Sequence, residues 1–185
     1  MPEEGFFGSR MVRVTVRKSR GGRLVILCGI PGSGKTTIGK ALGARLGRCV
    51  HVETDAIRAM LGVVEYTSGE SRFVYDAATS VAEEALRHKY DAILIATFPR
   101  EEFRRMALSR LEKLFESWLV VWVWCDPQVA YQRNARRTDR VPLESFMRLW
   151  RSFEPPRGAL VIDSQRLTPE DAAAKILAAM GGDEG

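Results

Sequence analysis

The chain has 185 residues, of which 45% are hydrophobic and 28% charged, which is typical of one globular domain and argues against a disordered chain. The longest apolar runs, 24–30 and 119–125, are far shorter than the roughly 20 residues of a membrane span, so we expect no membrane partner. No apolar signal-peptide core precedes residue 25, and the three scattered cysteines lack metal-ligand spacing, so we expect reduced thiols in a cytoplasmic protein.

The net charge of +5 is concentrated in two segments. Residues 10–23 contain six basic side chains and no acidic one, and residues 133–151 contain six basic against two acidic side chains. We therefore expect a basic N-terminal arm over residues 1–22, followed by one domain over residues 23–181.

Strands and helices are predicted to alternate along the domain. Apolar runs predict strands at 23–28, 49–53, 92–96, 119–125 and 159–162, and periodicity and capping residues predict helices at 35–46, 55–61, 71–89, 101–116, 127–138, 143–153 and 169–180. Ser71 is the expected cap of the third helix, with Phe73 and Val81 on its buried face, and Phe115 is placed on the buried face of the fourth. The order favours a parallel sheet covered by helices on both faces.

The loop after the first strand matches G-x-x-x-x-G-K-[ST] in full, as Gly29-Ile-Pro-Gly-Ser-Gly34-Lys35-Thr36. Glycines let backbone N–H groups turn toward a polyphosphate, and the following helix directs its positive end at it. Lys35 would reach the terminal phosphates, and the Thr36 hydroxyl would be a ligand of Mg²⁺. We expect a nucleotide-phosphate site formed by Gly29, Pro31, Gly32, Ser33, Gly34, Lys35, Thr36 and Thr37.

Asp55 and Arg58 follow the second strand. A carboxylate at this place could face the γ-phosphate and accept the proton of an attacking hydroxyl, and Arg58 could bind a phosphate one helical turn away. The same residues suit a helix N-cap and a solvated surface, so these residues alone leave both interpretations open. The guanine motif of small GTPases is absent, and the third strand ends without the acid expected of an ATPase motor.

The phosphate loop, Asp55-x-x-Arg58 and the arginine-rich segment together resemble the small P-loop kinases. This group includes gluconate kinase, adenylylsulfate kinase, zeta-toxin-like kinases and the kinase domain of 5′-hydroxyl polynucleotide kinase, to which the similarity is strongest. The lid pattern of that domain is matched by Arg133-Asn134-Ala135-Arg136-Arg137, then Val141-Pro142 and a helix. Ala96-Thr97-Phe98 stands where the family often has Asp-Thr-Asn.

The resemblance implies a three-layer α/β P-loop fold of five parallel strands with an arginine-bearing lid at about 133–153. It implies ATP and Mg²⁺ as cofactors, Lys35, Asp55, Arg58, Arg133 and Arg137 as catalytic residues, and Asp55, Arg58, Thr97 and Arg136 as acceptor-binding residues. Arg133 and Arg137, four residues apart, are expected on one helical face. The expected acceptor is the 5′-hydroxyl end of RNA or DNA. The alternatives are a small-molecule hydroxyl (sugar acid, nucleoside or adenylylsulfate) and a non-catalytic nucleotide switch that binds RNA.

Overall fold

The computed structural model describes residues 21–63 and 67–181. Five parallel strands form one sheet in the order β2-β3-β1-β4-β5. Their bounds are β1 Gly22–Cys28, β2 Cys49–Glu53, β3 Asp91–Ile95, β4 Phe115–Trp124 and β5 Leu160–Asp163. Strand β1 begins at Gly22, one residue before the predicted domain boundary, and residues 1–20 of the predicted basic arm lie outside the described residues.

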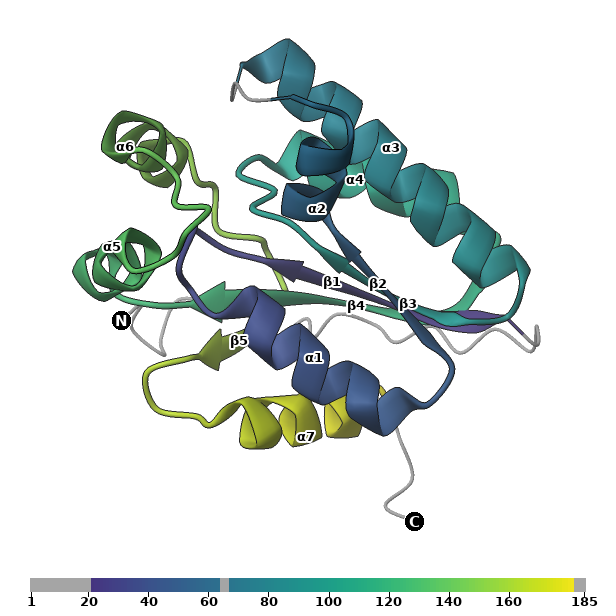
Figure 1. The fold of residues 1–185 in the computed structure, drawn as a ribbon. Coiled ribbons are helices and arrows are strands. Elements are labelled where there is room, and N and C mark those ends of the chain that lie inside the picture. The colour runs from purple at the N-terminus through teal and green to yellow at the C-terminus, as the bar shows by residue number, and fades with distance from the viewer. Residues whose placement is uncertain (1–20, 64–66, 182–185) are drawn as a thin grey trace.

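Seven helices in the described part of the chain surround this sheet: α1 Lys35–Leu46, α2 Thr54–Met60, α3 Ser68–Arg87, α4 Glu101–Leu111, α5 Pro127–Ala135, α6 Leu143–Arg151 and α7 Pro169–Ala179. Helices α1 and α7 cover one face and α3 and α4 the other, while α5 and α6 lie together at the carboxyl ends of the strands (Figure 1). None of these helices has the length and apolar character needed to cross a bilayer.

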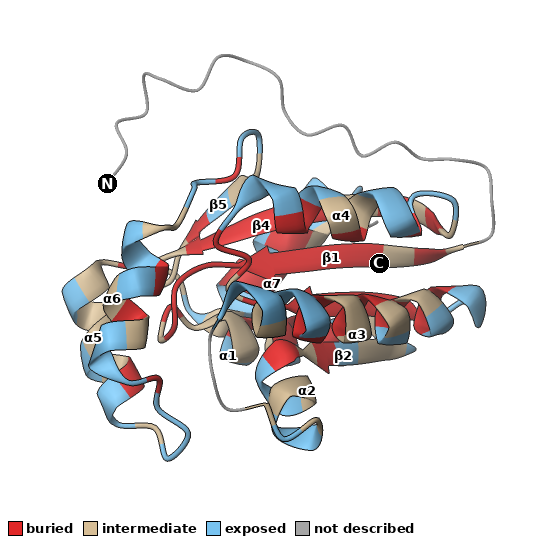
Figure 2. Ribbon diagram, turned by 90° about the horizontal axis from the view of Figure 1, so that it is seen from above, coloured by how far each residue is buried: buried red, intermediate tan, exposed pale blue. Residues whose placement is uncertain are grey.

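Strand β1 is the centre of both cores. Leu24 and Ile26 pack toward α3 and α4, and Val25 and Leu27 pack toward α1 and α7, all without solvent exposure (Figure 2). A strand covered on both faces must be apolar at successive positions, which is why its sequence is nearly continuous in hydrophobic residues. All five strands run parallel, so their carboxyl ends meet at one edge of the sheet, where the loops after β1, β2 and β3 come together.

Helix α3 begins three residues earlier than predicted. The Thr67 hydroxyl, rather than that of Ser71, caps the helix by accepting a hydrogen bond from the Glu70 N–H at 3.3 Å. Its buried face includes Val74 and Ala78, whereas Phe73 and Val81, expected to face inward, are 54% and 39% exposed.

The predicted boundary between α4 and β4 is also wrong. Helix α4 ends at Leu111, and Phe115 begins β4 beside Gly22 of β1, whereas the sequence predicted a helix as far as 116. Both interpretations bury Phe115, so its hydrophobicity could not distinguish them. Helices α5 and α6 are shorter than predicted, ending at Ala135 and Arg151.

An ion pair at the amino ends of the strands gives a first testable prediction. The Arg23 guanidinium donates to both carboxylate oxygens of Asp91, with an Nη2–Oδ2 distance of 2.7 Å, and the Arg23 backbone N–H donates to Oδ1 at 2.7 Å. Asp91→Ala leaves a half-buried guanidinium and a backbone N–H without their acceptor, so we expect it to lower the free energy of unfolding by about 2 kcal/mol.

The measurement is urea denaturation at neutral pH. Glu102→Ala is the control, because its pair with Arg100 is exposed and should contribute little. Equal effects of the two substitutions would contradict a structural role for the Arg23–Asp91 pair.

Candidate active site

The phosphate loop is packed so closely that two of its positions have no space for a side chain. A Cβ at Gly32 would lie 2.1 Å from the Ala130 carbonyl oxygen of α5, and one at Gly29 would lie 2.4 Å from the Val123 carbonyl oxygen of β4. Both residues have positive φ, 80° at Gly32 and 151° at Gly29, which favours glycine on conformational grounds as well. The loop therefore requires glycine here whatever ligand it holds.

Helix α1 starts at this loop with an open amino end. Gly34, in the left-handed conformation, precedes the helix, no side chain caps it, and its first turn contains no acidic residue. The uncapped N–H groups and the positive end of the helix dipole are suited to binding an anion.

Lys35 is held inside the loop. Its ammonium donates to the carbonyl oxygens of Gly29 and Ile30, both at 2.9 Å. Burial lowers the pKa of Lys35 to about 8, and the negative charge of Asp55 offsets only part of that effect. A polyphosphate in the loop would stabilise the charged form and raise this pKa again.

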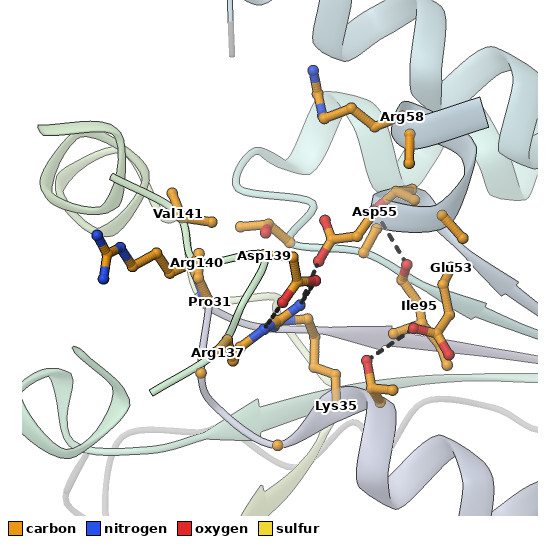
Figure 3. Close-up of a pocket in the computed structure, with 18 of the residues that line it drawn as sticks. Pro31, Lys35, Glu53, Asp55, Arg58, Ile95, Arg137, Asp139, Arg140 and Val141 are labelled. Atoms are coloured by element: carbon orange, nitrogen blue, oxygen red, sulfur yellow. Dashed lines mark hydrogen bonds and ion pairs between the residues drawn. The ribbon is translucent and has the colours of Figure 1, made fainter. Parts of the chain in front are cut away.

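Thr36 and Glu53 form the pair best suited to a magnesium ion. The Thr36 hydroxyl donates to Glu53 Oε2 at 3.1 Å, and Glu53 is the last residue of β2 (Figure 3). Within residues 21–63 and 67–181 no group of three or more His, Cys, Asp or Glu side chains could form a metal cage. A hydroxyl and one carboxylate fit Mg²⁺, which keeps several waters and takes further oxygens from substrate phosphates. Glu53 was not among the predicted site residues, although an acid at a strand end could have indicated it.

Asp55 lies in the first turn of α2 and points toward the α5–α6 loop, residues 136–142. Its Oδ2 is 3.3 Å from the Arg137 guanidinium, which also donates to both oxygens of Asp139 at 2.9 and 2.6 Å (Figure 3). The hydrogen bonds of Asp139, followed by the field of Asp55, raise the pKa of Arg137, and Arg137 in turn lowers the pKa of Asp139. The carboxylate predicted as the base is thus paired with an arginine predicted to bind phosphate.

These side chains line one cavity of about 970 Å³, large enough for a nucleotide and a small acceptor group. Six cationic residues face it against three carboxylates: Lys35, Lys40, Arg58, Arg133, Arg137 and Arg140 against Glu53, Asp55 and Asp139. The formal excess of three positive charges suits a polyphosphate ligand.

The predicted arginines reach this cavity in different ways. Helix α5 ends before residue 137, so the prediction that Arg133 and Arg137 share a helical face is wrong, although both line the cavity. Arg133 donates to the Ser164 hydroxyl and carbonyl at 3.1 and 3.3 Å, which ties it to the end of β5. Arg136 is exposed and is not among the lining residues. Arg58 lines the cavity, with its guanidinium directed away from Lys35 (Figure 3).

Asn134, which sequence reasoning did not single out as a site residue, holds the α5–α6 loop in place. Its side chain is 1% exposed, donates to the Val141 carbonyl at 2.8 Å and accepts from the Val141 N–H at 3.0 Å. These paired bonds close the segment that carries Arg137 and Asp139.

Thr97 lines the cavity from the loop after β3. The Gly29 N–H donates to its carbonyl at 3.3 Å, so this loop touches the phosphate loop directly. The next residue, Phe98, is fully buried with a φ of 43°, a conformation that costs a non-glycine residue roughly 1–2 kcal/mol. Strain of this kind persists only where the surroundings hold it in place.

The strand order and the loop between β1 and α1 define a P-loop NTPase fold, which confirms the predicted fold class. The chain belongs to the AAA domain family, whose model matches residues 24–156.

Proteins similar to the chain in sequence or in fold include several kinases. The chain is 23% identical over 137 residues to L-seryl-tRNA(Sec) kinase of Methanococcus maripaludis. The aligned region covers 72% of this chain but only 53%, about half, of that relative's length. Among solved structures, APS kinase of Mycobacterium tuberculosis superposes with a TM-score of 0.72 at 16% identity, covering 87% of this chain and 98% of the other. A gluconokinase of Sinorhizobium meliloti superposes with a TM-score of 0.64 at 19% identity, covering 89% and 94%.

The lowered pKa of Lys35 predicts that nucleotide affinity depends on pH. Between pH 7.5 and 9.5 the unliganded ammonium loses its proton, whereas bound phosphates would favour the charged form, so binding should take up a proton and weaken about tenfold across this range. Isothermal titration of ATP in buffers of different ionisation enthalpy measures the uptake. In Lys35→Arg, which stays charged, the uptake should disappear; uptake that persists in this variant would contradict the assignment to Lys35.

Proposed function

We propose that this protein is an ATP- and Mg²⁺-dependent kinase that transfers the γ-phosphoryl group to a hydroxyl. The observation that carries the proposal is the placement of Asp55 in one cavity with Lys35 and the Thr36–Glu53 pair. A protein that only binds and releases nucleotide has no need of a carboxylate beside the terminal phosphate. The relatives that are named as kinases support the same proposal.

The residues have separable tasks in this proposal. The loop amides and Lys35 bind the phosphates, and Thr36 and Glu53 would hold Mg²⁺, which neutralises charge on the β- and γ-phosphates. Asp55 accepts the proton of the acceptor hydroxyl. The hydroxyl oxygen bonds to the γ-phosphorus while the bond from that phosphorus to the ADP oxygen breaks. Arg137, once transferred from Asp55 to the phosphates, would stabilise the charge that develops on them and leave the carboxylate free.

The α5–α6 region, with Arg133 and Arg137, is proposed as the lid. Closure of such a segment excludes water, which would otherwise compete with the acceptor for the phosphoryl group. The segment between α5 and α6 is largely exposed, and its Arg137 guanidinium is bound to side chains only, Asp55 and Asp139, within the described part of the chain, which supports a segment that can shift toward a ligand.

The first proposed acceptor is the 5′-hydroxyl end of RNA or DNA. The basic composition of residues 10–23 supports a long anionic acceptor, whereas the charges of the cavity would serve the phosphates of ATP whatever the acceptor is. The name of one relative, L-seryl-tRNA(Sec) kinase, also refers to a substrate carried on RNA.

A small-molecule hydroxyl is the second candidate, and the loop after β3 favours it. Residues 96–98 are Ala-Thr-Phe where the polynucleotide kinase pattern often has Asp-Thr-Asn. Thr97 is therefore the only one of these three side chains that could hydrogen-bond to an acceptor, which weakens the match to a polynucleotide-binding loop. The names of two structural neighbours, APS kinase and gluconokinase, refer to small-molecule substrates.

Asp55→Ala tests the proposed base. We expect phosphoryl transfer to fall by about 10²-fold or more because no other carboxylate takes its place, while the affinity for ATP stays the same or rises slightly. Steady-state rates and titration calorimetry measure the two effects. Glu112→Ala, which removes an exposed carboxylate outside the cavity, is the control. Unchanged transfer in Asp55→Ala would remove the basis for the proposed mechanism.

Labelling with γ-labelled ATP distinguishes the acceptors. Against 5′-hydroxyl oligonucleotides and a panel of sugar acids, nucleosides and adenylylsulfate, we expect label on the oligonucleotide, with binding that weakens steeply as salt is raised, because phosphate contacts release counterions. Label on a metabolite together with flat salt dependence would favour the second candidate. Nucleotide-dependent RNA binding without turnover on any acceptor would show a switch.

A further inference from the structure

Arg104, in α4, is the largest fully buried side chain in the described part of the chain, with 2% exposure. Its guanidinium donates to the Phe98 carbonyl at 2.7 Å, to the Glu154 carbonyl at 2.9 Å and to a Glu101 carboxylate oxygen at 2.8 Å. Two of these partners are backbone atoms from segments more than 50 residues apart in the sequence. One belongs to the loop after β3, and the other follows α6.

Further hydrogen bonds join the same two segments. The Glu154 N–H donates to the Pro99 carbonyl at 2.7 Å, and the Glu101 N–H donates to the Glu154 carboxylate at 2.8 Å. Glu154 lies three residues beyond the end of α6, and its neighbour Phe153 stacks on Trp122 of β4 at 6.0 Å between ring centroids. The segment where the proposed lid returns to the sheet is therefore fastened at both its backbone and its side chains.

The loop after β3, which Arg104 joins to the segment after α6, forms part of the cavity wall. The loop held by Arg104 carries Thr97, which lines the cavity, and Phe98, which is held at positive φ against Tyr75 with ring centroids 4.8 Å apart. The Phe98 carbonyl that Arg104 binds belongs to the strained residue itself. Loss of this bond would remove one of the contacts that hold Phe98 at positive φ, and Thr97 is its immediate neighbour in the chain.

An arginine at this position satisfies two backbone carbonyls that would otherwise lack these donors, at the cost of burying a charge. Its one carboxylate partner, Glu101, is half exposed, and its buried Nε has no hydrogen-bond partner among residues 21–63 and 67–181. Burial of a charge with incomplete pairing is unfavourable, and an apolar side chain could fill such a space. What an apolar side chain could not do is join two backbone segments at fixed geometry, which the planar guanidinium does.

We propose that Arg104 is a positioning residue that makes the loop after β3 and the segment after α6 move as one unit. Closure of the lid over the phosphates and placement of Thr97 against the acceptor then occur together, although Arg104 touches neither ligand. The inference rests on the proposed function only in treating α5–α6 as a lid and Thr97 as an acceptor contact.

Hydrogen exchange measures this coupling without any acceptor. With Mg²⁺ and a non-hydrolysable ATP analogue, amides of residues 97–101 and 152–158 in the wild type should both exchange about fivefold or more slowly. In Arg104→Met the phosphate loop should remain protected, whereas the response at 97–101 should fall below about twofold. Arg105→Met, an exposed neighbour on the same helix, is the matched control and should behave as wild type.

Two outcomes would overturn the proposal: no nucleotide response at 97–101 in the wild type, or an unchanged response in Arg104→Met. If Arg104→Met does not fold, Glu154→Ala provides the test, because Glu154 is exposed and its carboxylate accepts, within the described part of the chain, only the bond from the Glu101 N–H. That variant should weaken the response in part, and a full wild-type response would again overturn the coupling.

Catalysis gives an independent readout, with a 5′-hydroxyl oligonucleotide as the probe. We expect Arg104→Met to raise the KM for the oligonucleotide and the ratio of ATP hydrolysis to transfer, each about tenfold, with little change in ATP affinity. A purely structural role would instead lower all rates together with the folded fraction and leave KM unchanged. Absence of transfer by the wild type would refute the polynucleotide acceptor, while the exchange experiment would still decide the role of Arg104.

Discussion

The close approach of the phosphate loop to α5 is the constraint on which the rest of the site depends. At Gly32 the loop lies so near the Ala130 carbonyl that even a methyl group would clash, so the position of one element determines that of the other. Helix α5 then carries Arg133 to the end of β5 and Asn134 to the backbone of Val141. The loop that would hold ATP thus also sets the starting point of the segment proposed to close over it.

Much of this arrangement could be predicted because it depends on patterns local to the chain. The phosphate loop needs glycine at fixed positions, so its sequence is recognisable. A strand buried on both faces needs apolar residues at successive positions, as in β1. Element ends were predicted less well, because pairing between distant segments decides them. Phe115 suits a buried helix face and a buried strand equally, and only its register beside Gly22 places it in β4.

The site divides along the same line. The location of Lys35, Thr36 and Asp55 in one cavity was predictable, because it follows from their spacing to the phosphate loop or to the end of a strand. Asn134 and Arg104 were not predictable, because both bind mainly backbone groups, and every residue has a backbone carbonyl whatever its side chain. A buried arginine in an amphipathic helix resembles any solvated arginine until the tertiary structure is known.

The charges of the cavity also impose an order on the proposed reaction. Arg137 is shared by two carboxylates, whereas the Lys35 ammonium, among the described residues, donates only to carbonyl oxygens and has a lowered pKa. We therefore expect the phosphates to bind at Lys35 first, because its ammonium is not paired with a carboxylate as Arg137 is. Once they are bound, they compete with Asp55 for Arg137, while Asp139 keeps the guanidinium near. In the proposed reaction Asp55 would lose this partner only when a nucleotide is present, so the carboxylate would become available as a base when there is a phosphoryl group to transfer.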